Sequence, residues 1–126
     1  MKDKRINIVQ IEGRCTQDIE KVETKNGKVI AKFTLAYDSF MQTDDEGSYA
    51  SFVKVICYTD IAIFALDKLE KGMQIFLQGK LLQRRFVDKN NNKKSYFQIV
   101  AQNILVTDLN NRPNLETQSS MERSLV

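Results

Sequence analysis

The chain has 126 residues, of which 42% are hydrophobic and 28% charged, enough for one compact domain and too few for two ordinary ones. Its 19 basic and 16 acidic side chains leave a formal net charge of +3, which suits a polyanionic partner but is also common in domains without one. No apolar run has the length that spans a membrane, and Cys15 and Cys57 lie in separate strand-like runs. We therefore expect a protein of the reducing cytoplasm with two buried free thiols and no membrane contact.

The first part of the chain predicts strands. Residues 6–15 are expected to form a strand in which Gly13 marks a bulge or the close approach of another backbone. Residues 22–37 hold two strand-like runs around Asn26-Gly27, a dipeptide that favours a type I′ hairpin turn with positive φ at both central residues. The pattern thus predicts a first strand followed by a hairpin.

The middle of the chain changes from loop to strand to helix. The polar stretch 41–48 is expected to be a loop, and its acidic cluster TDDE lacks the spacing of a calcium loop and receives no role. Residues 51–58 alternate as a half-buried strand. Residues 60–71 then show helical spacing, with Asp60 placed as the N-cap and Gly72 directly after the last turn.

Residues 73–106 return to a period of two around a polar turn at 90–92, so a long hairpin is expected. The predicted class is all-β with one short helix. This order of elements is that of the OB-fold, a five-stranded Greek-key barrel whose strand face and loops bind oligonucleotides or oligosaccharides, here with a long hairpin between the last two strands. We assign residues 1–107 to this domain and expect residues 108–126, which contain the only proline, to be a disordered tail.

Two of the predicted strands carry outward-facing aromatic and basic side chains. In the strand 51–58, Val53, Val55 and Cys57 suffice for the core, so the opposite face, which also includes Ile56, is not needed for it. Exposed aromatics stack on unpaired bases while cations hold phosphates, so their interleaving is typical of sequence-tolerant binding to single strands. The candidate residues from this pattern are Phe52, Lys54, Tyr58, Lys80, Arg84, Arg85 and Phe86.

Each of these residues alone also has an ordinary structural explanation. Single exposed aromatics are common, Lys54 could merely discourage edge pairing, and arginines could keep a long hairpin soluble. Phe76, which lies next to Gln74 and Gln78 in the pattern, is expected to be a subunit contact. Taken together, however, the interleaved aromatics and cations form a combination that core packing does not require.

The sequence offers no site for catalysis. It has no histidine, no Cys-x-x-Cys pair, no phosphate-binding P-loop and no dinucleotide-binding glycine fingerprint. We therefore expect no enzyme activity, no catalytic residue, no metal and no cofactor.

Four segments, in their order and spacing, resemble the bacterial single-stranded DNA-binding protein (SSB) family over about residues 6–106. They are INIVQIEGRCTQD, NGKVIAKFTLA, SFVKVICYTDIAIFALDKLEKG and IFLQGKLLQRRFVD. The resemblance implies an OB-fold protein that coats exposed single-stranded DNA during replication, recombination and repair, in the bacterial cytoplasm and associated with the nucleoid. It also implies a homotetramer of two dimers, with first-strand pairing in each dimer and the Gln74, Phe76 and Gln78 face joining dimers.

The resemblance also implies roles for individual residues. Base stacking falls on Phe52, Tyr58 and Phe86, and a further family tryptophan maps to Met41 with Phe40 adjacent. The family's basic contacts map onto Lys54, Lys71, Arg84 and Arg85.

Two departures from the family bear on partners. Asp60 stands where the family commonly has a basic residue, and the chain ends in SSMERSLV without the family's acidic tip and terminal Pro-Phe. Recruitment of replication proteins through such a tip is therefore not supported. The alternative function is an OB-fold primosome-type adaptor that binds protein, with incidental nucleic-acid binding. RNA as ligand stays open, because stacking and phosphate contacts do not sense the 2′-hydroxyl.

Overall fold

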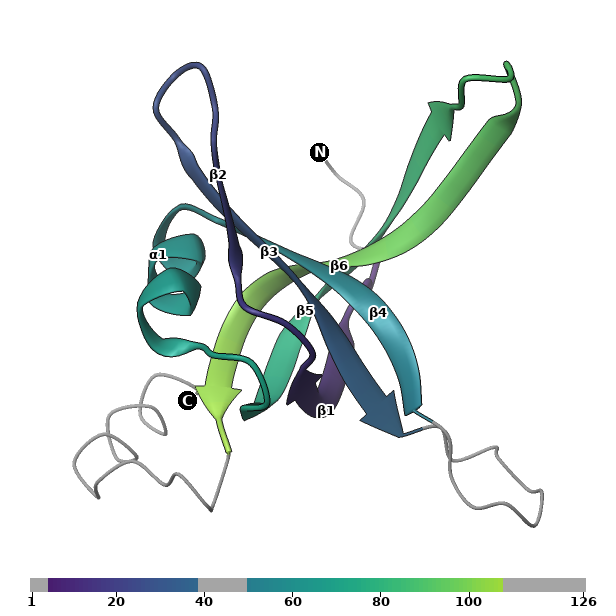
Figure 1. Ribbon diagram of the computed structural model, residues 1–126. Coiled ribbons are helices and arrows are strands. Elements are labelled where there is room, and N and C mark those ends of the chain that lie inside the picture. Colours follow the sequence, from purple (N-terminus) through teal and green to yellow (C-terminus); the bar gives the residue numbers. More distant parts are fainter. Residues whose placement is uncertain (1–4, 39–49, 108–126) are drawn as a thin grey trace, which may run out of the picture.

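The computed structural model describes residues 5–38 and 50–107. The predicted tail, the acidic loop cluster and the candidates Phe40 and Met41 therefore lie outside the described residues. The elements, shown in Figure 1, are β1 (Val9–Cys15), β2 (Glu20–Glu23), β3 (Val29–Asp38), β4 (Ala50–Tyr58), α1 (Thr59–Lys68), β5 (Gln74–Val87) and β6 (Lys93–Val106). No helix within the described ranges has the length and apolar character to cross a membrane.

Five of the strands close into a barrel. The sheet order is β1-β5-β6-β4-β3-β2, and β1 pairs with β3 as well, which closes the ring. The β4–β6 pairing is parallel and the others are antiparallel. The five-stranded OB-fold barrel is thereby confirmed, and β2 is an additional short strand attached to β3 outside the ring.

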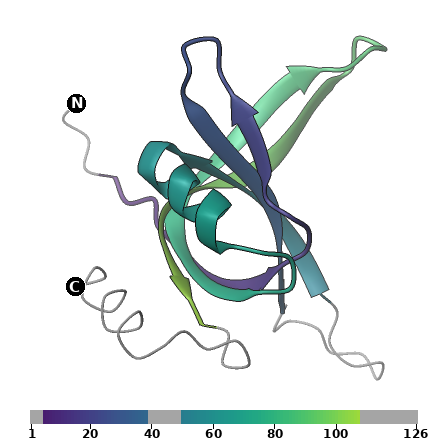
Figure 2. The same cartoon turned by 60° about the vertical axis from the view of Figure 1, so that its left-hand side comes forward.

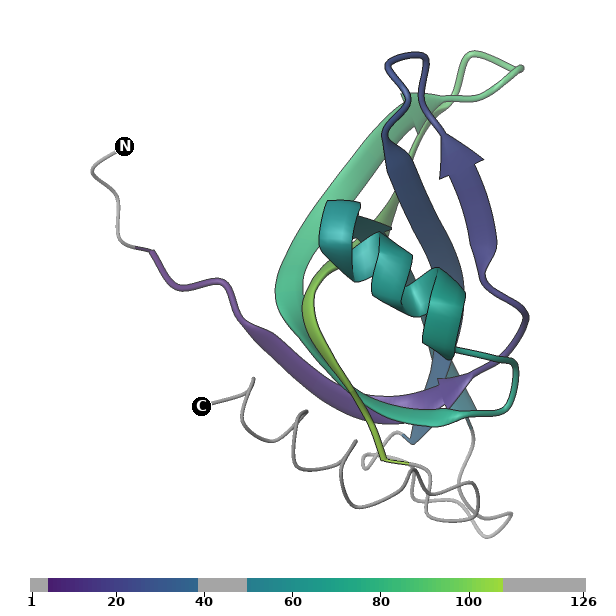
Figure 3. The ribbon, with the colours of Figure 1, turned by 90° about the vertical axis from the view of Figure 1, so that its left-hand side faces the viewer.

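The barrel interior holds the hydrophobic core, and α1 lies across one opening of the ring (Figure 3). The inward faces of β3 and β4 supply Phe33, Leu35 and Val55, and α1 contributes its buried alanines, Ala62 and Ala65. Each large aliphatic or aromatic side chain buried in this way contributes about 1.5–3 kcal/mol of transfer free energy. The core parity predicted for the strand 51–58, Val53, Val55 and Cys57, is confirmed.

The barrel brings two glycines against neighbouring backbones. A Cβ atom at Gly13 would overlap the carbonyl oxygen of Ala36 on β3, and one at Gly79 would overlap that of Val100 on β6. Of the two expectations for Gly13, the structure thus shows the close backbone approach. At Gly79 the β5–β6 register also shifts, between Gln78 and Gly79.

The predicted helix boundaries need correction. The N-cap residue of α1 is Tyr58, whose side chain makes no capping bond, and Asp60 lies in the first turn. The helix ends at Lys68, where Leu69 is extended and its N–H donates to the carbonyl of Ala65. Gly72, with φ of +88°, follows later and donates its N–H to Cys15, so it serves the turn into β5 and not the helix end.

Both predicted hairpin turns are present. The β2–β3 turn closes through a bond from the N–H of Gly27 to the carbonyl of Thr24 (3.0 Å). Gly27 has φ of +83° but Asn26 has no positive φ, so the predicted type I′ geometry is wrong. The two hairpins, β2–β3 and β5–β6, extend from the barrel on the same side (Figure 2).

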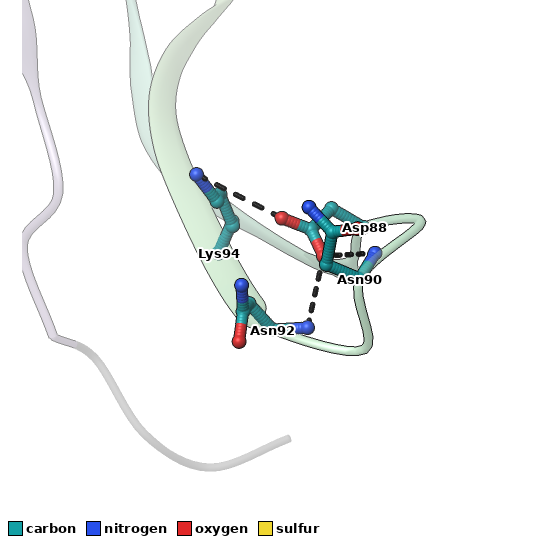
Figure 4. A network of polar contacts seen from close by, with 4 residues as sticks. All are labelled: Asp88, Asn90, Asn92 and Lys94. Atoms are coloured by element: carbon teal, nitrogen blue, oxygen red, sulfur yellow. Dashed lines mark hydrogen bonds and ion pairs between the residues drawn. The ribbon is translucent and has the colours of Figure 1, made fainter.

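The tip of the β5–β6 hairpin is fixed by one carboxylate (Figure 4). Oδ1 of Asp88 accepts the backbone N–H groups of Asn90 and Asn92, both at 2.9 Å. Oδ2 of Asp88 lies 3.8 Å from Nζ of Lys94. The turn sets the register of the long hairpin, in which Arg84 lies opposite Tyr96 and Phe86 opposite Lys94.

Candidate nucleic-acid interface

Strand registers place the predicted aromatic and basic residues on one outer face of the sheet. Thr34 pairs with Lys54, Lys54 with Gln98, and Gln98 with Leu82, so one row of side chains crosses β3, β4, β6 and β5. Residues two positions apart on each strand extend this row along the same face. The outer face, as defined here, comprises Ile30, Lys32, Thr34, Ala36, Phe52, Lys54, Ile56, Tyr58, Lys80, Leu82, Arg84, Phe86, Lys94, Tyr96, Gln98 and Val100.

Strand β4 crosses the middle of this face. Phe52 is 62% exposed, Lys54 is exposed, and Tyr58 retains 36% of its surface at the far end of the strand. Ile56 was expected to face solvent but is only 4% exposed. It lies in the interior of the sheet, where β4 pairs with β3 at Lys32 on one side and with β6 at Val100 on the other.

The aromatic residues of the hairpin continue the face beyond the barrel. Phe86, 46% exposed, meets the ring of Tyr96 edge-on, with ring centroids 6.2 Å apart. Nζ of Lys54 lies 5.3 Å from the centroid of the Tyr96 ring, within cation–π range. Tyr96 therefore connects the aromatic hairpin to the cation on β4, a role that the sequence analysis missed.

Arg84 joins the hairpin to two other strands. Its Nε donates to Oε1 of Gln98 at 2.8 Å, and its Nη2 donates to the hydroxyl of Tyr58 at 3.0 Å. Gln98 is only 4% exposed, so its amide is a buried polar group that requires this partner. The contacts fix the Tyr58 hydroxyl relative to the hairpin, and within residues 5–38 and 50–107 the Nη1 group of Arg84 makes no hydrogen bond.

The other predicted basic residues are placed differently. Lys80 is exposed on the outer face opposite Val100. Arg85 follows Arg84 and points to the opposite side of the strand, where its Nη2 donates to Gln83 at 2.7 Å. Lys71 lies in the turn before β5, at the other end of that strand from Arg84. The structure therefore brings Lys80 and Arg84 to one face but not Arg85 or Lys71.

A hollow of about 210 Å³ adjoins the aromatic cluster. It lies among β2, β3, β4 and β6, and its lining residues are Gln17, Glu20, Lys32, Phe33, Thr34, Lys54, Val55, Tyr96 and Gln98. A larger hollow of about 700 Å³ lies beside β1 and the adjoining ends of β3 and β4. Lys54, Tyr96 and Gln98 of the outer face line the smaller hollow and not the larger one, so the smaller hollow is the one that belongs to the candidate interface.

The predicted subunit-contact residues lie on β5 beside β1. Nε2 of Gln74 donates to Glu12 at 2.7 Å, and Oε1 of Gln74 accepts from Arg14 at 3.1 Å. Phe76 is half-buried opposite Glu12, and Gln78 lies opposite Gln10. These residues share one side of the β1–β5 pair, which is compatible with the predicted contact but leaves it a prediction.

The two thiols lie in the core and not at the interface. Burial raises the pKa of Cys15 to about 11. Burial, and secondarily the charge of Cys15, raises the pKa of Cys57 to about 12. Both thiols are free and protonated at neutral pH. Across the described residues, no group of three histidine, cysteine, aspartate or glutamate side chains is arranged to hold a metal ion.

Comparison with known proteins gives one consistent result. A family model described as the single-strand binding protein family matches residues 6–107. The mitochondrial single-stranded DNA-binding protein of Rattus norvegicus is 30% identical over 114 residues, covering 82% of this chain and 74% of the rat protein. The single-stranded DNA-binding protein of Thermotoga maritima is 26% identical, covering 94% of this chain and 84% of that protein.

A solved structure, the Plasmodium falciparum SSB complex with ssDNA, superimposes with a TM-score of 0.75 at 23% identity. It covers 86% of this chain and 100% of that one. At this identity the superposition supports the OB-fold of the chain.

Proposed function

Because this chain belongs to the single-strand binding protein family, whose model matches residues 6–107, we propose that it binds single-stranded DNA without strong sequence preference. The observation that carries the proposal is the continuous outer face, on which three strands bring exposed aromatics and cations together. In the proposal Phe52, Tyr58, Phe86 and Tyr96 stack on bases. Lys54, Lys80 and Arg84 hold phosphates.

The geometry favours single strands over duplexes. A duplex hides the flat faces of its bases inside the stack, whereas an unpaired strand can lay successive bases on aromatic rings for about 1–3 kcal/mol each. The protein would coat and protect exposed DNA during replication, recombination and repair, in the cytoplasm and on the nucleoid, as a binding protein without catalysis.

A homotetramer is part of the proposal. One OB-fold covers about 4–16 nucleotides, so wrapping a longer strand needs several copies. First-strand pairing would form each dimer, and the side of β5 that carries Gln74, Phe76 and Gln78 would join the dimers. Sedimentation showing a monomer at working concentrations would remove this part of the proposal.

The deciding experiment is fluorescence anisotropy with a labelled dT oligonucleotide and a matched duplex, at low and moderate salt. The proposal requires tight binding to the single strand that survives moderate salt, and much weaker binding to the duplex. Weak binding to both, abolished by salt, would overturn it and would favour a protein-binding adaptor.

A further inference from the structure

The hollow beside Tyr96 is lined by Glu20, Lys32 and Gln98, polar residues that the proposed stacking and phosphate contacts leave unused. Its lining residues come from β2 and the segment before it, and from β3, β4 and β6. The hairpins β2–β3 and β5–β6 extend from the barrel on the same side (Figures 1 and 2). Tyr96 borders it with an aromatic ring, and the core residues Phe33 and Val55 adjoin it. A hollow next to a stacking aromatic is where the edge of one base of a bound strand can enter.

Three charged groups border the hollow. Glu20 lies opposite Lys32 on the β2–β3 pair, and Lys54 approaches from β4. Within the part of the chain that the structure describes, none of these three makes an ion pair with another side chain. The hollow therefore offers one carboxylate that only accepts hydrogen bonds and two ammonium groups that only donate them.

Gln98 gives the hollow a fixed donor. Its side chain is almost fully buried, and its Oε1 is already taken by Nε of Arg84. The amide nitrogen is then the polar atom of Gln98 that remains to face a ligand in the hollow that this residue lines. Because Arg84 holds the amide orientation, this donor is positioned before a ligand binds.

Among the four bases, guanine matches this arrangement of acceptors and donors. Its N1–H and N2–H groups are adjacent donors for one carboxylate, and its O6 and N7 atoms accept from cations. Thymine presents two carbonyls around a single N–H, so a carboxylate facing that edge is repelled. Adenine and cytosine each offer a carboxylate only one exocyclic amine.

We propose that this hollow takes one guanine of a bound single strand, with its Watson–Crick donors on Glu20 and its O6 and N7 near Lys32, while Lys54 holds a phosphate of the same strand. The inference rests on the proposed single-strand binding and adds to it a local base preference. The surrounding aromatic face remains sequence-tolerant, so the preference acts at one position of the bound strand.

The test compares dT oligonucleotides of about 16 nucleotides, the upper site size of one OB-fold, that differ by one central base. Anisotropy titrations of the full chain should show tighter binding when one dT is replaced by dG, by about fivefold, the lower end of what a well-placed base contact gives. Replacement of the same dT by dA or dC should give a smaller gain in affinity. A single dG avoids the self-association of guanine-rich strands.

Glu20→Gln should remove most of the dG preference, since the amide keeps only one acceptor oxygen and presents its NH2 donor to the second guanine donor. Glu23→Gln is the matched control, because it removes the same charge from β2 three positions away, on the other face of the strand. Both variants should strengthen binding to dT slightly and equally by electrostatics. Circular dichroism checks that each remains folded.

Three outcomes would overturn the inference. Equal binding of the dG and dT strands by the unmodified protein would show that the hollow does not discriminate, while the proposed function stands. A dG preference that survives Glu20→Gln largely intact, or that falls equally in Glu23→Gln, would place its origin elsewhere. Failure to bind any strand would remove the proposed function itself.

Discussion

The guanidinium of Arg84 donates to the hydroxyl of Tyr58 at 3.0 Å, linking the long hairpin to the end of β4. A second bond, from Nε of Arg84 to Gln98, ties the same group to β6. Arg84 therefore holds the Tyr58 ring in place in addition to any contact that it makes with a phosphate. The two roles of this arginine can be separated experimentally.

Arg84→Lys should weaken binding to dT by about fivefold without changing its salt dependence, because the charge is kept and the two-pronged hydrogen bonding is lost. Tyr58→Phe keeps the stacking ring and removes the hydroxyl that Arg84 holds. Since both variants break the same bond, the loss in the double variant should be smaller than the sum of the single losses. Additive losses would show that the bond does not contribute to binding.

Phe86→Ala, Phe52→Ala and Tyr96→Ala should each weaken binding to dT by about 1–3 kcal/mol at every salt concentration, because stacking does not depend on counterion release. Phe97→Ala is the matched control, since Phe97 is 53% exposed on the same hairpin but lies opposite Gln83, off the outer face. Isothermal titration calorimetry measures the affinity of all four variants for dT. An effect of Phe97→Ala as large as that of Phe86→Ala would mean that the face is misassigned.

Lys54→Ala should lower the slope of log affinity against log salt by about 0.7, the value for one lost contact to a single-strand phosphate. Lys68→Ala, on α1 beside Asp67, removes the same charge away from the outer face and should leave the slope unchanged. Titrations at four or more salt concentrations give the slopes. Equal slopes for Lys54→Ala and the unmodified protein would mean that Lys54 touches no phosphate.

The sequence pattern predicted where the outer face lies, but it did not predict every residue on that face. Alternation in β4 identified Phe52, Lys54 and Tyr58 without any knowledge of the neighbours of this strand. Tyr96 was missed because it precedes Phe97, and a run with two adjacent aromatics does not show which of them faces the site. The missing information was the turn register, which pairs Arg84 with Tyr96.

The errors in the predicted fold also arise because the outcome depends on neighbouring structure that the local sequence does not show. Asp60 has the residue type of an N-cap, but β4 passes into α1 without a loop, and the turn is made at Thr59, whose φ is +48°. Left-handed backbone is unusual for a β-branched residue, so no propensity rule predicts it there. The burial of Ile56 likewise depends on which strands flank β4, and this follows only from the closed barrel.

Gly79→Ala should destabilise the fold by about 3 kcal/mol, the upper end for overpacking, because the new methyl group would overlap the backbone carbonyl of Val100 and separate β5 from β6. Gly27→Ala is the comparison, since its Cβ would meet nothing but its φ is +83°, at a cost of about 1–2 kcal/mol. Urea denaturation, monitored by circular dichroism, measures the free energy of unfolding of both variants. A smaller loss for Gly79→Ala than for Gly27→Ala would contradict the close approach at the barrel seam.

The two core thiols should make the protein less stable at alkaline pH. Their pKa values in the folded state, about 11 for Cys15 and about 12 for Cys57, lie above the ordinary value of 9.0. The folded state thus favours the neutral thiols, and the stability that they add is complete below pH 9 and is lost as the pH rises toward 11–12. Between pH 8 and pH 10 the free energy of unfolding should fall by about 1 kcal/mol per thiol beyond the loss from other groups. The double variant Cys15→Ala, Cys57→Ala retains every lysine and tyrosine, so urea denaturation at both pH values should show a shallower fall for it; identical falls would mean that the thiols ionise as readily in the folded protein as in the unfolded chain.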